Sequence, residues 1–457
     1  MRSGCVVVVL AAAITAAAPA GTPVRWEVVS TTGIQKPVGE IGHARLDGVL
    51  HVTWGRRAGP SSYDLVHTQI SASGTVGPSE AVVTGWVGAG SSALFIGPNR
   101  GLWVFFPGSR TTDPNEPHFG LNFSARSVGQ PWMLHTPSYY RDQFAHGRTP
   151  AAAALTGNRA IAAWDGRDGV GVFPVHHGTF VTGYGPSGTS AACCRHGVNI
   201  VVGASDRTML AWCAMNEAPN GIWAQEVNPV TGAPVGAAMR MPGSTNAQGQ
   251  RICDVGQRVP LVAGRGGGFF IAAKDGAERA ILVWRVGTPR SDRITAGPAF
   301  RRVGLAAAPD DRLWVGWSRF LTASRLYLRR SNRRGTVFGA TVQRPGPAGA
   351  VEVQVIDLSA QRDRVDILGT YSAVAGSNLF HSQALPGLTL AATGGKILRF
   401  RVTDAGDPIA GARVSVGGRN LVTDGAGRAS VDLRPGRYTA AATKSGYVGA
   451  TKRVRAR

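Results

Sequence analysis

The chain has 457 residues, with 49 Lys and Arg against 27 Asp and Glu, which gives a formal net charge of +22 at pH 7. Only five of the basic residues are lysines, so almost all of the positive charge is carried by guanidinium groups. A chain with 43% hydrophobic and 17% charged residues, 62 glycines and 27 prolines is neither a disordered polymer nor a coiled coil or long-helix protein. Its length suits two domains, or one large closed β architecture with a small appendage.

Residues 1–20 predict a secretory signal peptide. Arg2 supplies a positive charge before the apolar run Cys5–Ala17, and the small residues Ala18–Ala20 offer a cleavage site before Gly21. The apolar run is shorter than the roughly 20 residues that span a bilayer, which favours cleavage over a membrane anchor. Later stretches are not long and apolar enough to span a membrane. We therefore expect a secreted, extracellular protein.

A short apolar strand that ends on an aromatic or bulky residue recurs along the rest of the chain, on average about every 53 residues, a spacing typical of repeat architectures. Apolar residues do not recur at helical spacing over several turns. The sequence therefore predicts an all-β, repetitive fold. The strands end at Trp54, Phe106, Trp164, Trp212, Lys274, Trp317 and Thr370.

Each repeat contains the four strands of a β-propeller blade. A strand of small residues such as Pro150–Leu155 precedes the marked strand, and an alternating strand such as Arg325–Arg330 follows it. Small innermost strands are expected because blades crowd together at the propeller axis. The strand Val24–Val29 precedes the first unit, and the last unit shows only three strands, so we expect the early strand to complete it. This match favours a seven-bladed propeller over residues 21–387, with six blades as the alternative.

The units resemble sialidase-like propellers, in which the turn between the third and fourth strands often carries an Asp-box, Ser-x-Asp-x-Gly-x-x-Trp/Phe. The nearest match, Ser331–Phe338, keeps the serine, the glycine and the aromatic residue but has Arg333 in the Asp position. Other turns keep only a glycine, as at Gly74 and Gly232, and the Phe-Arg-Ile-Pro signature of the family is absent. The resemblance implies a propeller, and for its catalytic members an Arg triad, a Tyr nucleophile with a Glu partner, and an Asp acid/base.

Few residues fit those catalytic roles. The spacing of these residues in the sequence does not indicate that they share one active site. Glycoside hydrolysis needs two carboxyl groups at a defined distance from each other, which a sequence does not reveal. The tyrosines fit packing between blades equally well. The candidates are Tyr139, Tyr140, Asp142 and Glu217.

Arginines recur at the positions that a propeller brings to one face, in the turns before an innermost strand and after a second strand. A guanidinium group binds a carboxylate or phosphate through two parallel hydrogen bonds. These arginines therefore predict an anion-binding funnel; alternatively, they only set solubility, and a bacterium with a GC-rich genome would itself be rich in Arg. The predicted ligand-binding residues are Arg57, Arg148, Arg167, Arg258, Arg302 and Arg319.

Cleavage of the signal peptide would leave four cysteines. An even number in an exported chain is compatible with two disulfides in three possible pairings, and the adjacent pair is poorly placed to bond to itself. Without a Cys-x-x-Cys pair or clustered histidines we expect no metal and no cofactor. The disulfide candidates are Cys193, Cys194, Cys213 and Cys253.

Residues 388–395 predict a linker rich in Gly, Ala and Thr, and residues 396–457 a second domain of short alternating strands with Gly turns. The runs Gly406–Val416 and Thr423–Leu433 are similar to the carboxypeptidase regulatory-like domain, a prealbumin-type β-sandwich. The resemblance implies a spacer or adhesive module without catalysis. The segment carries 13 basic and four acidic residues, and its tail Thr451–Arg457 is suited to an anionic surface.

These features predict a monomeric, secreted, non-catalytic binding protein that recognises an acidic glycan or an anionic cell-envelope polymer through an arginine-rich propeller face. One alternative is a sialidase-like glycoside hydrolase or lyase, and a second is a protein–protein interaction scaffold. Export and the scarcity of aromatic residues near basic runs argue against nucleic acid as the partner.

Overall fold

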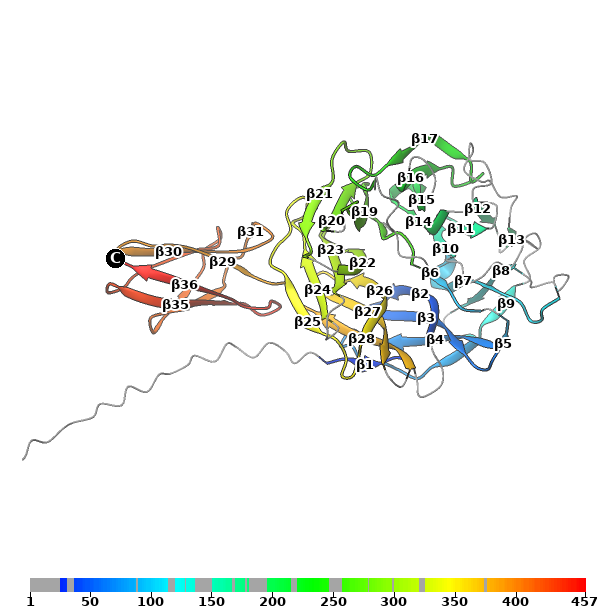
Figure 1. Cartoon of the computed structure of the whole chain (residues 1–457), viewed down its shortest axis with the longest axis horizontal. Helices are drawn as coiled ribbons and strands as arrows, with labels where there is room; N and C mark the ends of the chain where they lie inside the picture. The colour runs from blue at the N-terminus through cyan, green and yellow to red at the C-terminus, as the bar shows by residue number, and fades with distance from the viewer. Residues whose placement is uncertain are drawn as a thin grey trace, which may run out of the picture.

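The computed structural model of the chain consists almost wholly of β-strands, which confirms the all-β prediction (Figure 1). It describes residues 25–30, 37–87, 89–113, 120–127, 129–135, 150–166, 169–176, 179–180, 195–214, 220–245, 257–277, 279–297, 300–319, 325–373 and 376–457. Within these ranges the helical elements are two 3-10 turns, η1 (Pro98–Arg100) and η2 (Ala204–Asp206). None of the described helices is long and apolar enough to cross a membrane.

Seven four-stranded antiparallel sheets follow one another along the described chain up to Ala384. Sheet 1 comprises β2 (Pro37–Leu46), β3 (Val49–Arg57), β4 (Tyr63–Ile70) and β5 (Glu80–Trp86). Sheet 2 comprises β6 (Ala93–Ile96), β7 (Leu102–Gly108), β8 (Gly120–Arg126) and β9 (Met133–His135). Sheet 3 comprises β10 (Ala151–Leu155), β11 (Arg159–Gly166), β12 (Gly169–His176) and β13 (Thr179–Phe180). Sheet 4 comprises β14 (Arg195–Val202), β15 (Thr208–Ala214), β16 (Gly221–Val227) and β17 (Pro234–Arg240).

The remaining three sheets repeat the same order. Sheet 5 comprises β18 (Leu261–Ala263), β19 (Phe269–Lys274), β20 (Ala280–Arg285) and β21 (Asp292–Thr295). Sheet 6 comprises β22 (Phe300–Ala307), β23 (Leu313–Arg319), β24 (Arg325–Arg330) and β25 (Val342–Pro345). Sheet 7 comprises β26 (Glu352–Ala360), β27 (Val365–Ala373), β28 (Gly376–Ala384) and, as its fourth strand, β1 (Glu27–Val28).

The seven sheets form a ring with their first strands at the centre, which is the propeller arrangement (Figure 1). The first strand of each sheet contacts the first strand of the next, and β26 of sheet 7 contacts β2 of sheet 1. A separate apolar cluster lies between each pair of neighbouring sheets, including sheets 7 and 1. The core is therefore a cycle of interfaces between sheets, as close packing of blades requires.

The residues that mark the repeat all lie on the second strand of their sheet, as predicted. Trp54, Trp212 and Trp317 are at most 4% exposed and fill the space between neighbouring sheets. The first strands carry small residues such as Ala151–Leu155 because seven of them share the space around the axis.

The ring closes through the strand that precedes sheet 1. Glu27 and Val28 pair with His381 and Phe380 of β28, which confirms the prediction that the early strand completes the last unit. Trp26 extends this contact because its Nε1 donates a hydrogen bond to the Pro345 carbonyl at 2.9 Å. The closing strand is only two residues long, so side chains contribute much of the closure.

The degenerate Asp-box lies where the resemblance places it, in the turn between β24 and β25. The Ser331 hydroxyl accepts a hydrogen bond from the Leu313 amide at 2.8 Å. Asn332 Oδ1 accepts from the Thr336 amide at 3.0 Å, and Gly335 adopts a φ of +72° that favours glycine. The amide of Asn332 thus stabilises the turn without an Asp at position 333.

The chain beyond Leu388 forms two further four-stranded sheets around one apolar core, and we call residues 388–457 the C-terminal module. Its first sheet comprises β29 (Thr389–Thr393), β30 (Ile397–Asp404), β31 (Asp407–Pro408) and β34 (Arg428–Asp432). Its second comprises β33 (Arg419–Val422), β32 (Arg413–Val416), β35 (Gly436–Thr443) and β36 (Ala450–Ala456). The prediction of a linker over 388–395 is wrong, because β29 pairs with β30 and buries Leu388 and Leu390.

The C-terminal module is attached to sheet 6 by buried ion pairs. Arg330 of β24 pairs with Asp404 of β30, and both side chains are at most 4% exposed. Arg312, before β23, pairs with Asp404 at 3.5 Å and with Asp407. The Arg330 guanidinium also lies 5.6 Å from the ring centroid of Tyr447 in the module. Buried, mutually bonded charges of this kind fix the geometry between the two parts.

Candidate functional site

The first strands of the seven sheets surround a central channel with a volume of about 490 Å³. Most of its wall consists of backbone and small or aliphatic side chains, as along Ala152–Ala154 and Ala306–Ala307. The polar side chains among its lining residues are therefore conspicuous. They are His43, Asn199, Gln257, Arg258, Asp357 and Ser359.

Arg258, which precedes β18, joins sheet 5 to sheets 1 and 2 across this channel. Its amide donates to Glu40 Oε1 at 2.9 Å, and its guanidinium Nη2 donates to the carbonyls of Ile41, at 3.3 Å, and Ser92. The Arg258 side chain is only 16% exposed. The Arg258 guanidinium thus donates its hydrogen bonds to backbone carbonyls of the ring, and the residue links sheet 5 to sheets 1 and 2.

Glu40 of β2 is the most perturbed carboxyl group of this cluster. It is 1% exposed, and burial, together with the charge of Asp357, raises the pKa of Glu40 to about 8 despite the opposing effect of Arg258. Burial also lowers the pKa of His43. At neutral pH the Glu40 carboxyl therefore holds its proton and can donate a hydrogen bond.

Several buried polar atoms around Arg258 have no hydrogen-bond partner among the described residues. They are Glu40 Oε2, Gln257 Oε1, Arg258 Nε and Asp357 Oδ2. A set that mixes donors and acceptors suits water or a small polar group. Because Glu40 is almost fully enclosed, this cluster is not a surface on which a polymer chain could lie.

The other predicted arginines do not all reach this cluster. Arg302, in the bulge of β22, is close enough for its charge to lower the pKa of Glu40. Arg57 donates to the carbonyls of Gly59 and Pro60, and Arg319 Nε donates to the Ala296 carbonyl at 3.0 Å. The structure thus brings Arg258 into contact with Glu40, and it holds Arg57 and Arg319 by local contacts.

The remaining sequence candidates lie outside the described residues. These are Arg148, Arg167, Tyr139, Tyr140, Asp142, Glu217, Cys193, Cys194 and Cys253. Cys213 is buried in β15 and is disulfide-bonded, and the pairing of the cysteines stays a prediction. Among the described residues no group of three or more His, Cys, Asp or Glu side chains could hold a metal ion.

Sequence reasoning missed Glu40 and Asp357. The available signal is a single charged residue within an apolar innermost strand, as in Val353–Leu358, where Asp357 follows Val, Gln, Val and Ile. Burying a lone charge in such a strand is costly unless it is paired or neutralised, so a charge at this position indicates a special environment.

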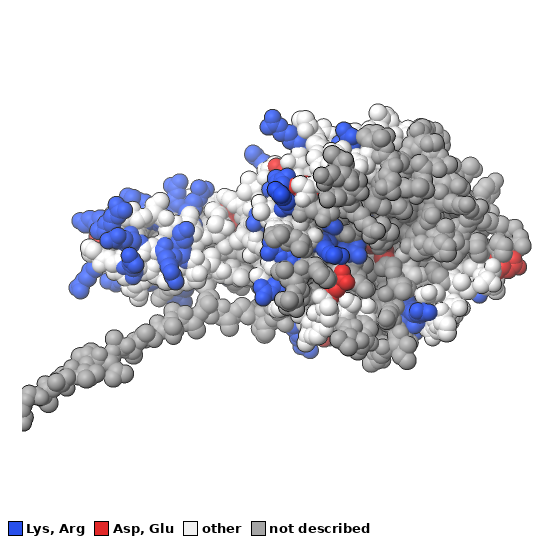
Figure 2. All heavy atoms as spheres, viewed as in Figure 1, with Lys and Arg blue, Asp and Glu red and all other residues white. Residues whose placement is uncertain are grey.

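A second concentration of charge covers the outer faces of the C-terminal module. Figure 2 shows basic side chains gathered over this part of the molecule, with few acidic ones among them. Strand alternation places Arg399 and Arg401 of β30 on the solvent side, and pairing sets Arg401 opposite Arg428. On the other sheet, Arg437 lies opposite Arg455. The module thus exposes like charges directly across from each other.

The acidic residues of the module neutralise little of this charge. Asp404 and Asp407 pair with Arg312 and Arg330 of the propeller. Asp424 Oδ1 accepts hydrogen bonds from the backbone amides of Ala426 and Arg428 within its own turn. Asp432 is exposed on the same face of β34 as Arg428 and lies diagonally across from Arg399, but it forms no ion pair with a described residue. Most arginines of the strand faces are therefore left to solvent and to external anions.

Comparison with known proteins assigns no family to the chain. No family model and no curated protein matches it. Among solved structures, it is similar to a protein of unknown function from Dyadobacter fermentans, with 11% identity and a TM-score of 0.46 over 79% of this chain and 99% of that one. The polysaccharide lyase Uly1 matches with 10% identity and a TM-score of 0.46 over 77% and 90% of the two chains. The endosialidase of phage phi92 matches with 8% identity and a TM-score of 0.45 over 81% and 72%.

Proposed function

We propose that this protein is an exported, monomeric, seven-bladed propeller with a C-terminal β-sandwich, which binds an acidic glycan or an anionic cell-envelope polymer without transforming it. The observation that carries the proposal is the surplus of exposed guanidinium groups. Many carboxylates form ion pairs within the fold. Asp64 pairs with Arg56, Asp366 with Arg45, and Glu226 with Arg207. The external arginines then remain available for a polyanion.

The propeller and the C-terminal module contribute differently to this proposal. In the propeller, Arg258 is enclosed in the ring, and Arg57 and Arg319 are held by nearby carbonyls. In the module, Arg399, Arg401 and Arg428 are exposed on the strand face of β30 and β34 and form no ion pair with a described carboxylate. Most of the contact with a polymer is therefore expected from the module, and a smaller part from the predicted propeller face.

Binding and catalysis are separated by one experiment on the full-length mature protein. We expect it to bind polygalacturonate and heparin in affinity electrophoresis, to ignore neutral dextran, and to lose affinity as salt is raised. Each polymer is also incubated with the protein and analysed for chain length and for released sugars. Binding without cleavage supports the proposal. Shortened chains or released sialic or uronic acid would favour the hydrolase or lyase alternative, and failure to bind any acidic polymer at low salt would refute the proposal.

A further inference from the structure

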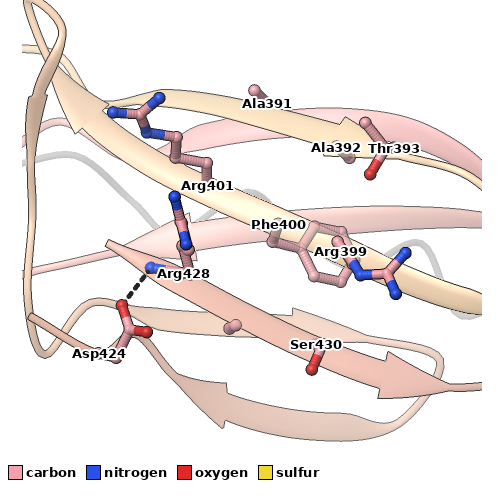
Figure 3. A pocket seen from close by; sticks show the side chains of 10 residues that line it. Ala391, Ala392, Thr393, Arg399, Phe400, Arg401, Asp424, Arg428 and Ser430 are labelled. Carbon is pink, nitrogen blue, oxygen red and sulfur yellow. Dashed lines mark hydrogen bonds between the residues drawn. The ribbon is translucent and has the colours of Figure 1, made fainter. Parts of the chain in front are cut away.

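The outward face of β29, β30 and β34 in the C-terminal module is hollowed into a groove of about 530 Å³ (Figure 3). Three long basic side chains rise from it, and short side chains form the floor between them. The groove is thus a shallow depression with guanidinium groups around it. Its outward-facing residues are Ala391, Thr393, Arg399, Arg401, Arg428 and Ser430.

The strand register sets the spacing of the three arginines. Arg401 of β30 lies directly opposite Arg428 of β34, and Arg399 follows two residues away on the same face. Neighbouring strands are about 4.8 Å apart, and alternate residues along a strand about 6.6 Å, so the three side chains emerge at separations of about 5 to 8 Å. Like charges directly opposite each other destabilise a sheet. An oxyanion between them would remove this repulsion.

The groove arginines are not engaged by the rest of the molecule. Within the described part of the chain, the guanidinium groups of Arg399, Arg401 and Arg428 have no ion pair with a carboxylate, and each residue is exposed. Asp424 lies at one end of the groove, where its Oδ1 accepts the Arg428 amide at 2.8 Å (Figure 3). The single acidic side chain of the groove is therefore occupied by its own turn.

We propose that this groove binds a segment of an acidic polysaccharide, and that it is the principal polymer-binding site of the protein. The inference rests on the proposed function and names the surface that performs it. Clustered guanidinium groups match the carboxylates or sulfates carried by successive sugars. The one aromatic lining residue, Phe400, is 2% exposed with its side chain in the core of the module, so the groove lacks the exposed stacking platform that single-stranded nucleic acids use. It also lacks the large apolar side chains that enter a membrane surface.

The test compares two full-length variants that lose the same charge. The groove variant is Arg399→Ala/Arg401→Ala/Arg428→Ala. The control variant is Arg437→Ala/Arg453→Ala/Arg455→Ala, which removes three exposed arginines from β35 and β36 on the other sheet of the same module. Affinity for heparin and polygalacturonate is measured over a range of salt, with double-stranded DNA as a competing polyanion, and thermal unfolding confirms that each variant folds.

We expect the groove variant to bind roughly tenfold more weakly than the wild type, because each lost contact contributes a modest share of the affinity. Its salt dependence should also fall by about one unit of slope for each arginine that meets the polymer. The control variant should retain most of the affinity. Equal losses in the two variants would show that net charge alone governs binding and would overturn the inference while leaving the proposed function intact. Tighter binding of DNA than of either polysaccharide would overturn the choice of ligand.

Asp424→Asn provides an independent test with the opposite sign. The asparagine Oδ1 can accept the same hydrogen bonds from the Ala426 and Arg428 amides, so the turn is expected to persist. Loss of the negative charge at the end of the groove should strengthen binding of both acidic polymers. Unchanged or weaker binding would contradict a site in this groove. If the wild type binds neither polymer, the proposed function itself fails, a result that the variants cannot imitate.

Discussion

Glu40 illustrates how the closed ring changes the chemistry of a single residue. Its carboxyl lies among the first strands, where burial and Asp357 oppose ionisation and the Arg258 amide and charge favour it. Burial prevails, and the pKa of Glu40 rises to about 8 from an ordinary value of 4.5. Since the Glu40 side chain is 1% exposed, its protonation affects the stability of the fold and not contact with a polymer.

This shift predicts a pH-dependent effect of Glu40→Gln. Between about pH 4.5 and pH 8 the folded protein keeps a proton that the unfolded chain has released, so rising pH favours unfolding of the wild type. Glutamine does not titrate, and its oxygen can still accept the Arg258 amide. The free energy of unfolding of the variant relative to the wild type should therefore increase with pH across this window, as measured by urea denaturation at several pH values.

Glu226→Gln is the matched control for that measurement. The hydrogen bond from Arg207 lowers the pKa of Glu226, so the stability that this carboxylate contributes is present above its ordinary range and is lost as the pH falls below it. The difference between this variant and the wild type should therefore change at acidic pH and stay constant toward pH 8. A flat difference for Glu40→Gln over the same range would show that Glu40 is ionised in the folded protein.

The closing strand β1 is the weakest element of the ring by length, because two residues form its ladder with β28. Trp26 compensates for this. Its ring centroid lies 5.2 Å from that of Tyr371 in an edge-on arrangement and 6.5 Å from that of Phe380. Edge-to-face pairs add to the free energy gained by burial, so one side chain supplies a large part of the closure.

Trp26→Ala is accordingly expected to lower the free energy of unfolding by about 2 kcal/mol, since it removes both ring contacts and the hydrogen bond to Pro345. Trp26→Phe should lose about half of that, because a ring remains and only the hydrogen bond is missing. Arg25→Ala, which removes an exposed partner of Glu27, should change stability by less than about 0.5 kcal/mol. Equilibrium denaturation checks the series, and equal effects of the two tryptophan substitutions would contradict a role for ring packing.

Elements with a strong local signal could be predicted from the sequence. The aromatic ends of the second strands, such as Trp54 and Trp317, recur because each fills an interface between sheets, and that repetition is visible along the chain. The strand β29 was not predicted, because its Gly, Ala and Thr composition is also that of a linker, and only pairing with β30 makes it a strand.

The central cluster could not be predicted because its members are far apart in sequence. Glu40 and Arg258 are separated by 218 residues and meet only when sheets 1 and 5 face the same channel. Position in a turn predicted that Arg258 would face the axis, and Arg258 lines the central channel, while its predicted role in ligand binding stays a prediction. Whether an arginine there binds a ligand or carbonyl groups of the ring depends on which backbone oxygens it reaches, and a linear pattern does not contain that information.

At the scale of the whole molecule, charge and architecture are linked through the contact between propeller and module. Arg312 and Arg330 belong to sheet 6, and the carboxylates that they engage, Asp404 and Asp407, belong to the module. The contact therefore attaches the module and at the same time removes negative charge from its surface. A polymer held by the groove would consequently stay at a fixed position relative to the propeller face.

Replacing Arg312 and Arg330 by methionine should release the module while keeping much of the packing of the long side chains against Trp314 and Tyr447. Asp404 would then be a buried charge without its partners, a change that destabilises proteins by about 3–5 kcal/mol. We expect one calorimetric transition for the wild type and two for the double variant, and a larger radius of gyration for the double variant in small-angle scattering. Arg364→Met, which breaks a pair with Asp363 within one turn of sheet 7 and leaves the pairs to Asp404 and Asp407 in place, should leave both measurements unchanged. If the double variant still unfolds in one transition with an unchanged scattering profile, the backbone contacts of Pro386 and Gly387 with Val448 hold the two parts together without the ion pairs.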